Sequence, residues 1–161
     1  MIEGLASGVH WFPVADPIHR YLVAGSGPVC IVNPDHSHTG PEYRRMPALE
    51  DCLTMAYLAP VAGLSDADRL DSGVEAQVRL LRAVVSHLGV RLPLIFGDGN
   101  GCTAAGQFAL RHPELLAGLI LYRAALDRPE DAYPAHLRAL AAAVPLLIID
   151  QPSGFVGRDV A

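Results

Sequence analysis

The chain has 161 residues, 51% of them hydrophobic, and a formal net charge of −5. This length and composition suffice for one sizeable core, so we expect a single domain over residues 1–161 and exclude a disordered or fibrous chain. The acidic balance and the absence of a basic run exclude a nucleic-acid partner, because phosphate binding depends on excess Lys and Arg. Small molecules or proteins are the expected partners.

The cysteines indicate the compartment. Cys30, Cys52 and Cys102 are odd in number, lie in apolar surroundings and form no C-x-x-C pair, which is typical of buried thiols in a reducing compartment. No apolar run approaches the length of a membrane span, and no secretory leader pattern opens the chain. We therefore expect a cytoplasmic protein that uses no membrane, and neither a metal nor another cofactor.

The first third of the chain predicts three short strands and a polar loop. Val9–Val14 and Arg20–Ala24 are β-prone runs, and Val29–Val32 is apolar throughout. The loop that follows, residues 33–40, carries Asp35, His36 and His38. These groups suit proton transfer or metal binding, whereas the simpler interpretation is a polar turn in which Asp35 caps the next segment.

The middle of the chain predicts another strand and a long helix. Leu53–Leu58 is the next apolar run. A capping box opens at Ser72, with Glu75 three residues on, and apolar residues then recur at helical spacing until Gly89. One face of this helix is expected to pack on a sheet.

Residues 92–114 carry the strongest local pattern, a strand, a sharp turn and a helix. Leu94–Phe96 is a short apolar run, as in a strand buried on both faces. Glycines at 97, 99 and 101 permit the turn, and helical spacing continues until Pro113. Further on we expect a strand at Leu116–Leu121, a helix through His136 and Leu140, and a strand at Val144–Ile149. The four strands predicted to be most buried are 29–32, 94–96, 116–121 and 144–149.

The turn resembles the nucleophile elbow of the α/β-hydrolase fold, normally G-x-S-x-G with the serine on a strained strand-to-helix turn. Gly97 and Gly101 match the small residues of that motif, so Gly99 takes the serine's place. In the alternative register Asp98 is the nucleophile, as in haloalkane dehalogenases, but Phe96 and Asn100 then stand where small residues are required. The resemblance therefore favours the register with Gly99, in which the nucleophile position has no side chain that could attack a substrate.

The resemblance implies an α/β fold with a doubly wound, mostly parallel sheet, shortened by loss of the lid domain and of the last strand and helix. The His-Gly pair that precedes the oxyanion loop in the family is Asn33-Pro34 here. The catalytic histidine that follows the last strand is not found, and Asp150 is the only candidate for the acid. Ordinary esterase or lipase activity is therefore not expected.

The predicted chemistry uses the helix N-terminus at the elbow. Its N–H groups and dipole favour negative charge, so we expect an anion pocket formed by Asn33, Gly99, Asn100 and Gly101. Asp35, His36, His38 or Asp98 would act as the base, in an elimination or ring closure that releases a sulfate-like anion from a small-molecule substrate. The alternative is a catalytically inactive subunit that stabilises or regulates a partner enzyme.

A partner chain is also expected. The strand predicted at Val144–Ile149 would lie at an open sheet edge, which is prone to pair with another chain. Loss of the lid would expose apolar surface above the elbow. A hetero-complex could cover both and is preferred to a homodimer, which could cover the edge alone.

Overall fold

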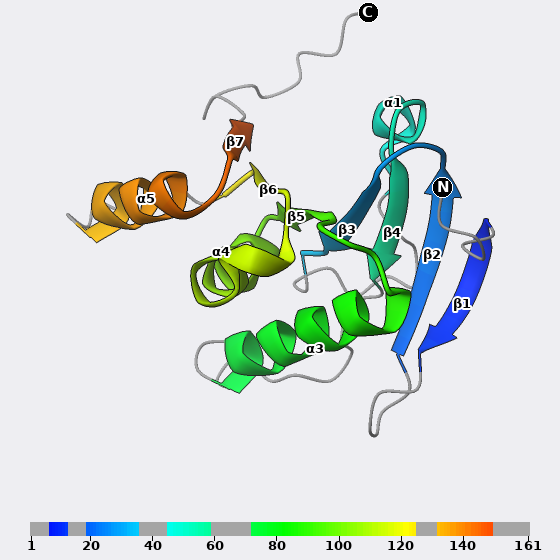
Figure 1. Cartoon of the computed structure of the whole chain (residues 1–161), viewed down its shortest axis with the longest axis horizontal. Coiled ribbons are helices and arrows are strands. Elements are labelled where there is room, and N and C mark those ends of the chain that lie inside the picture. The colour runs from blue at the N-terminus through cyan, green and yellow to red at the C-terminus, as the bar shows by residue number, and fades with distance from the viewer. Residues whose placement is uncertain (1–6, 13–18, 36–44, 59–71, 125–131, 150–161) are drawn as a thin grey trace, which may run out of the picture.

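The computed structural model describes residues 7–12, 19–35, 45–58, 72–124 and 132–149 (Figure 1). Strands and helices alternate over most of this length, as an α/β fold requires. The elements are β1 (Gly8–Phe12), β2 (His19–Gly25), β3 (Val29–Asn33), α1 (Pro47–Glu50), β4 (Thr54–Leu58), α3 (Ser72–Leu88), β5 (Leu94–Asp98), α4 (Gly101–Arg111), the 3₁₀ turn η1 (Pro113–Leu115), β6 (Gly118–Tyr122), α5 (Ala132–Ala143) and β7 (Leu146–Ile149).

The strands form one seven-stranded sheet in the order β1-β2-β4-β3-β5-β6-β7. The pairs β1–β2 and β2–β4 are antiparallel, and every other pair is parallel. Strand β5 lies between β3 and β6, with Asn33 opposite Gly97 and Tyr122 opposite Asp98. The carboxyl ends of β3, β5 and β6 therefore meet at one edge, where ligands bind in open α/β sheets.

Helices cover the two faces of the sheet unequally. α3 and α4 pack side by side on one face, α5 packs beside α4, and the short helix α1 lies on the other face (Figure 1). The larger apolar cluster lies under α3 and α4 and includes the fully buried Ile31, Leu81, Ile95 and Phe108. α3 ends at Gly89, whose φ of +61° is the left-handed conformation that terminates many helices.

Most predicted elements are confirmed, with three differences. β6 begins at Gly118 rather than Leu116, because Pro113 opens a 3₁₀ turn and the chain needs two more residues to return to the sheet. Helix α1 was not predicted. β7 is not among the most buried strands, since Leu147 and Ile149 are 53% and 37% exposed. Among the described strands β7 pairs only with β6, so its outer edge is unpaired in this part of the chain. The face of β7 that carries Leu147 and Ile149 is exposed.

Candidate functional site

The elbow between β5 and α4 is a tight turn that only small residues permit. Gly99 has φ +56°, in the left-handed region, and its N–H donates to the carbonyl oxygen of Tyr122 at 2.9 Å. A Cβ on Gly101 would lie 2.6 Å from the carbonyl oxygen of Asn33, so the helix start must be glycine to pass under β3. Gly97 is confined in the same way by the Cα atom of Cys102, at 2.7 Å from a built Cβ. This arrangement matches the register that puts Gly99 in the serine's place.

The space above Gly99 is filled by a carboxylate from another strand. Asp35 follows β3, and a Cβ built on Gly99 would overlap its Oδ2 and lie 2.7 Å from its Cγ. The Asp35 side chain is 14% exposed. An acidic group thus occupies the volume into which a nucleophilic side chain at position 99 would extend.

Arg123 connects this carboxylate to a second one. Its Nε and Nη2 donate to Oδ1 of Asp98 at 3.0 and 2.6 Å, and Nη2 lies 3.8 Å from Oδ2 of Asp35. Asp98 is 3% exposed, so its charge requires the guanidinium as a partner. Arg123 itself has φ +51°, which is uncommon for a residue with a side chain and typical of functional sites.

Two contacts hold Arg123 in this position. Its N–H donates to the carbonyl oxygen of Ile149 at 3.0 Å, which ties the end of β6 to the end of β7. Its guanidinium carbon lies 5.4 Å from the ring centroid of Tyr122, within the range of a cation–π interaction. The Nη1 atom donates to no residue in the described part of the chain.

Two of the N–H groups at the anion pocket predicted over Gly99 already have acceptors. The N–H groups of Gly99 and Cys102 already donate to the carbonyl oxygens of Tyr122 and Gly99. The Asp35 carboxylate covers the same place and would repel an anion there. The positive charge of the site comes instead from Arg123.

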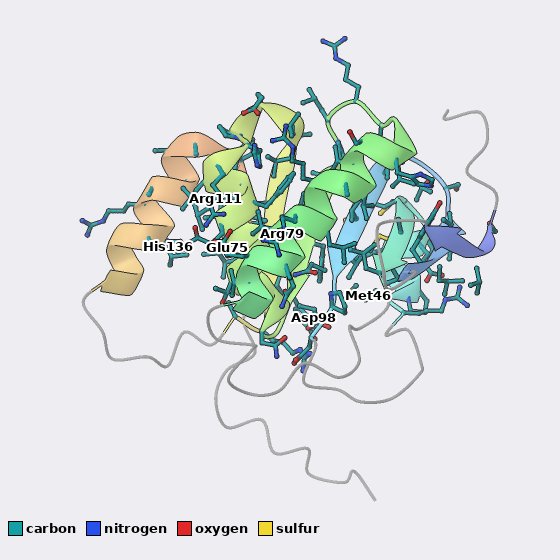
Figure 2. All side chains as sticks on the ribbon, turned by 90° about the horizontal axis from the view of Figure 1, so that it is seen from below. Met46, Glu75, Arg79, Asp98, Arg111 and His136 are labelled. Carbon is teal, nitrogen blue, oxygen red and sulfur yellow. The ribbon has the colours of Figure 1, made fainter. Side chains whose placement is uncertain are left out.

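A cavity of about 470 Å³ opens beside the elbow. Its walls come from β3, α4, β6 and α5, and Figure 2 shows His136 on the side of α5 that faces α4. Gly106 of α4 lies next to this imidazole, since a Cβ there would be in ordinary contact with Nε2 of His136, at 3.4 Å. The residues that line the cavity are Asp35, Gly99, Asn100, Cys102, Thr103, Gln107, Leu121, Arg123, Ala124 and His136.

The structure separates the predicted site residues into groups. Asp35, Gly99 and Asn100 line the cavity, whereas Asp98 is buried beneath it and pairs with Arg123. His36 and His38 lie outside the described residues, as does Asp150. Arg123 and His136 were missed. The position of Arg123 directly after an apolar strand could have identified it, but no local pattern relates His136 to the elbow.

Asn33 and Gly101 both make structural contacts, and their assignment to the anion pocket stays a prediction. Asn33 is fully buried, and its Nδ2 donates to Oε1 of Gln77 at 3.0 Å and to the carbonyl oxygen of Gly101 at 2.9 Å. These bonds tie β3 to α3 and to the start of α4. Neither residue lines the cavity.

Cys102 does not replace the missing nucleophile, although it lines the cavity. Its Sγ donates to the carbonyl oxygens of Gly97 and Tyr122 at 3.2 and 3.4 Å. Burial raises its pKa from 9.0 to about 12, so the reactive thiolate is suppressed at neutral pH.

Solved structures with the same architecture identify the fold. A membrane phospholipase A, described as a bacterial virulence factor, is 24% identical with a TM-score of 0.60 and aligns with 73% of this chain and 40% of its own. An alpha/beta fold family hydrolase from Bacillus anthracis is 16% identical with a TM-score of 0.56, over 72% of this chain and 43% of its own. The chain has the α/β-hydrolase fold. It spans less than half the length of these two structures, and neither a protein-family model nor a curated protein sequence matches it.

Neither a metal centre nor a membrane-spanning helix occurs among the described residues. No group of three His, Cys, Asp or Glu side chains is placed to hold a metal ion in this part of the α/β-hydrolase fold. Within the same ranges, no helix combines the length and the apolar character needed to cross a membrane.

Proposed function

We propose that this chain is a non-hydrolytic enzyme in which Asp35 removes a proton from a small anionic substrate. The observation that carries the proposal is the position of the Asp35 carboxylate over Gly99, where hydrolases of this fold hold a nucleophile. Gly99 has no side chain to form an acyl-enzyme. A carboxylate, in contrast, is ionised at neutral pH and acts as a general base.

Arg123 is the proposed anchor for the substrate's anionic group. Its Nη2 lies between the Asp98 and Asp35 carboxylates, while Nη1 is directed to no described partner. A guanidinium binds carboxylate, sulfate or phosphate groups through several N–H donors. Because Asp98 is buried and already paired, we assign it to holding Arg123 rather than to the base.

The reaction class follows from these two groups. Asp35 takes a proton from a carbon or an amine of the substrate, and the freed electron pair forms a new C=C or C–N bond. The bond to an anionic leaving group breaks as this pair moves, and the departing anion is stabilised by Arg123. An elimination or an intramolecular cyclisation with loss of a sulfate-like or carboxylate group fits this scheme.

The cavity sets the size and character of the substrate. Its volume of about 470 Å³ lies within the range of small-molecule sites. Leu121 and Ala124 form an apolar wall, while Thr103 and Gln107 project from one face of α4 at a spacing of one helical turn. A compact molecule with one charged and one apolar part would be complementary to this lining.

Proton exchange tests the proposal without knowledge of the natural substrate. The purified chain is incubated in D₂O with 2-oxobutanoate and with 4-oxopentanoate, which pair a carboxylate with exchangeable C–H groups, and deuterium uptake is followed by NMR. We expect Asp35→Asn to reduce the catalysed rate by about 10²–10⁴-fold. Asp51→Asn, an exposed aspartate outside the cavity, is the control and should leave the rate unchanged. Wild-type exchange no faster than that of Asp35→Asn rejects the proposal.

The alternative function is that of an inactive subunit of a partner enzyme. The exposed apolar side chains of Leu147 and Ile149 on β7 favour it, because an uncovered apolar strand readily pairs with another chain. A foreign partner, preferred to a second copy, could also contribute catalytic groups above the elbow.

The partner is tested by purification from the native host. Leu147→Glu with Ile149→Lys should abolish co-purification, while the matched exposed change Val9→Glu on β1 should not. A wild-type chain that is monomeric at high concentration, binds no apolar dye and recovers no stable partner would contradict this alternative.

A further inference from the structure

We infer that His136 is the second proton-transfer group of this cavity and that the substrate carries a carbonyl oxygen facing it. This inference rests on the proposed function and makes its substrate class more specific. His136 and Asp35 line the same cavity from different elements, α5 and the end of β3. A base and an imidazole in one cavity are the two groups that enolisation requires.

The packing of α5 on α4 presents the imidazole to the cavity. Gly106 in the interior of α4 lies next to the ring of His136 and the side chain of Leu140, which places the imidazole at the α4–α5 contact. His136 is only partly buried and makes no hydrogen bond with any residue in the described ranges. Its ring nitrogens can therefore contact a ligand.

The chemical step balances with these two groups. Asp35 takes the proton from the carbon next to the carbonyl, the C–H electron pair forms a C=C bond, and the carbonyl oxygen takes a proton from the His136 imidazolium. The enol then returns its proton to His136 and its C=O bond re-forms. The electron pair of the enol C=C bond moves to form a new C=C bond with the next carbon, and the group on that carbon departs with the electrons of its own bond. The substrate class is thus a small carbonyl compound with a leaving group on the second carbon from the carbonyl and an anionic group that reaches Arg123.

Variants of His136 test the inference with the exchange assay on 2-oxobutanoate and 4-oxopentanoate. We expect His136→Gln to lower the rate of deuterium uptake by about 10²-fold or more. In His136→Ala, added imidazole should restore a part of the lost rate, which a purely structural role would not allow. His87→Gln is the control, because His87 is exposed on α3 and does not line the cavity.

The outcomes separate the two proposals. If wild-type exchange depends on Asp35 but His136→Gln retains the full rate, the role of His136 is wrong and the proposed function stands. A His136→Ala protein that is folded and slow but unaffected by imidazole also overturns the inference. If the wild type gives no exchange above buffer, the proposed function is rejected and this inference with it.

Discussion

The carboxylate of Asp35 lies against the backbone of Gly99, in the space that any side chain at position 99 would need. The contact depends on the parallel pairing of β3 with β5, in which Asn33 lies opposite Gly97. Residues that follow these two strands are thereby brought to the same point above the sheet. The missing nucleophile and the acidic side chain above it are therefore one structural feature.

Alanine at Gly99 should cost more stability than alanine at Gly89. Both glycines have left-handed φ values, +56° and +61°, but a Cβ on Gly89 meets nothing within 4 Å. Gly89→Ala should therefore lower the free energy of unfolding by about 1–2 kcal/mol through backbone strain alone. Gly99→Ala should lower it by about 1–3 kcal/mol more, because the new methyl group overlaps Asp35. Urea denaturation checks this, and Asp35→Ala should recover the excess in the double variant. Equal losses at the two glycines would show that Asp35 does not occupy the site.

Serine at Gly99 should not create an esterase. The new hydroxyl would compete with Asp35 for the same space, and the group directly against it would be a carboxylate rather than the imidazole of a catalytic triad. Neither the wild type nor Gly99→Ser should hydrolyse p-nitrophenyl acetate above the buffer rate or react with a serine-directed fluorophosphonate. Stoichiometric labelling of the wild type would mean that another serine is activated.

Removal of Arg123 should destabilise the fold strongly. Arg123→Ala leaves the carboxylate of Asp98 buried without its partner, a loss of about 3–5 kcal/mol. Arg111→Ala removes the exposed pair with Glu75 between α4 and α3 and should change little (Figure 2). Combining Arg123→Ala with Asp98→Leu should recover much of the loss, as measured by chemical denaturation. A small effect of Arg123→Ala alone would mean that other contacts suffice to hold the Asp98 carboxylate.

Asn33 should matter for stability more than an exposed polar residue. Asn33→Ala leaves the carbonyl oxygen of Gly101 and the side chain of Gln77 without a buried partner, which should lower the free energy of unfolding by about 1–3 kcal/mol. Ser86→Ala, which changes an exposed residue of α3, is the control and should change it little. Thermal and urea unfolding of both variants give the comparison. Equal stabilities of the two variants would show that the hydrogen bonds of Asn33 contribute nothing net to folding.

Stability should decline above pH 9. Burial raises the pKa of the Cys30 and Cys102 thiols from 9.0 to about 12. The unfolded chain therefore loses these protons before the folded chain does, so their contribution is full below pH 9 and is lost as the pH rises toward 12. Burial likewise raises the pKa of Tyr57 from 10.0 to about 12.

Denaturation midpoints measured from neutral to alkaline pH test this dependence. Cys30→Ala and Cys102→Ala should flatten the decline, although each also removes packing. Cys52→Ala, at an exposed position, should leave the slope unchanged. In the native protein at neutral pH, iodoacetamide should modify Cys52 and spare the two buried thiols. A slope that is the same in all the variants would exclude the thiols as its cause.

The amino-acid sequence by itself determined most of the strands and helices and the turn between β5 and α4. The apolar run at 94–96, the glycines and the helical spacing before Pro113 are local signals, and backbone sterics convert them into a strand, a turn and a helix without distant contacts. The identity of Gly99 as the nucleophile position followed from the same local rule, since Gly97 and Gly101 are the positions that close backbone approach confines.

Only the tertiary structure decided what stands at the elbow. Asp35 reaches Gly99 through the register of β3 on β5, and Arg123 reaches Asp98 because β6 pairs with β5 and the chain then adopts a left-handed φ. His136 enters the cavity because α5 packs on α4 at Gly106. Each of these contacts joins segments far apart in the chain, and no local preference encodes them. The predicted anion pocket illustrates the difference: the helix N-terminus is a local feature, but the carboxylate against Gly99 comes from the segment after another strand.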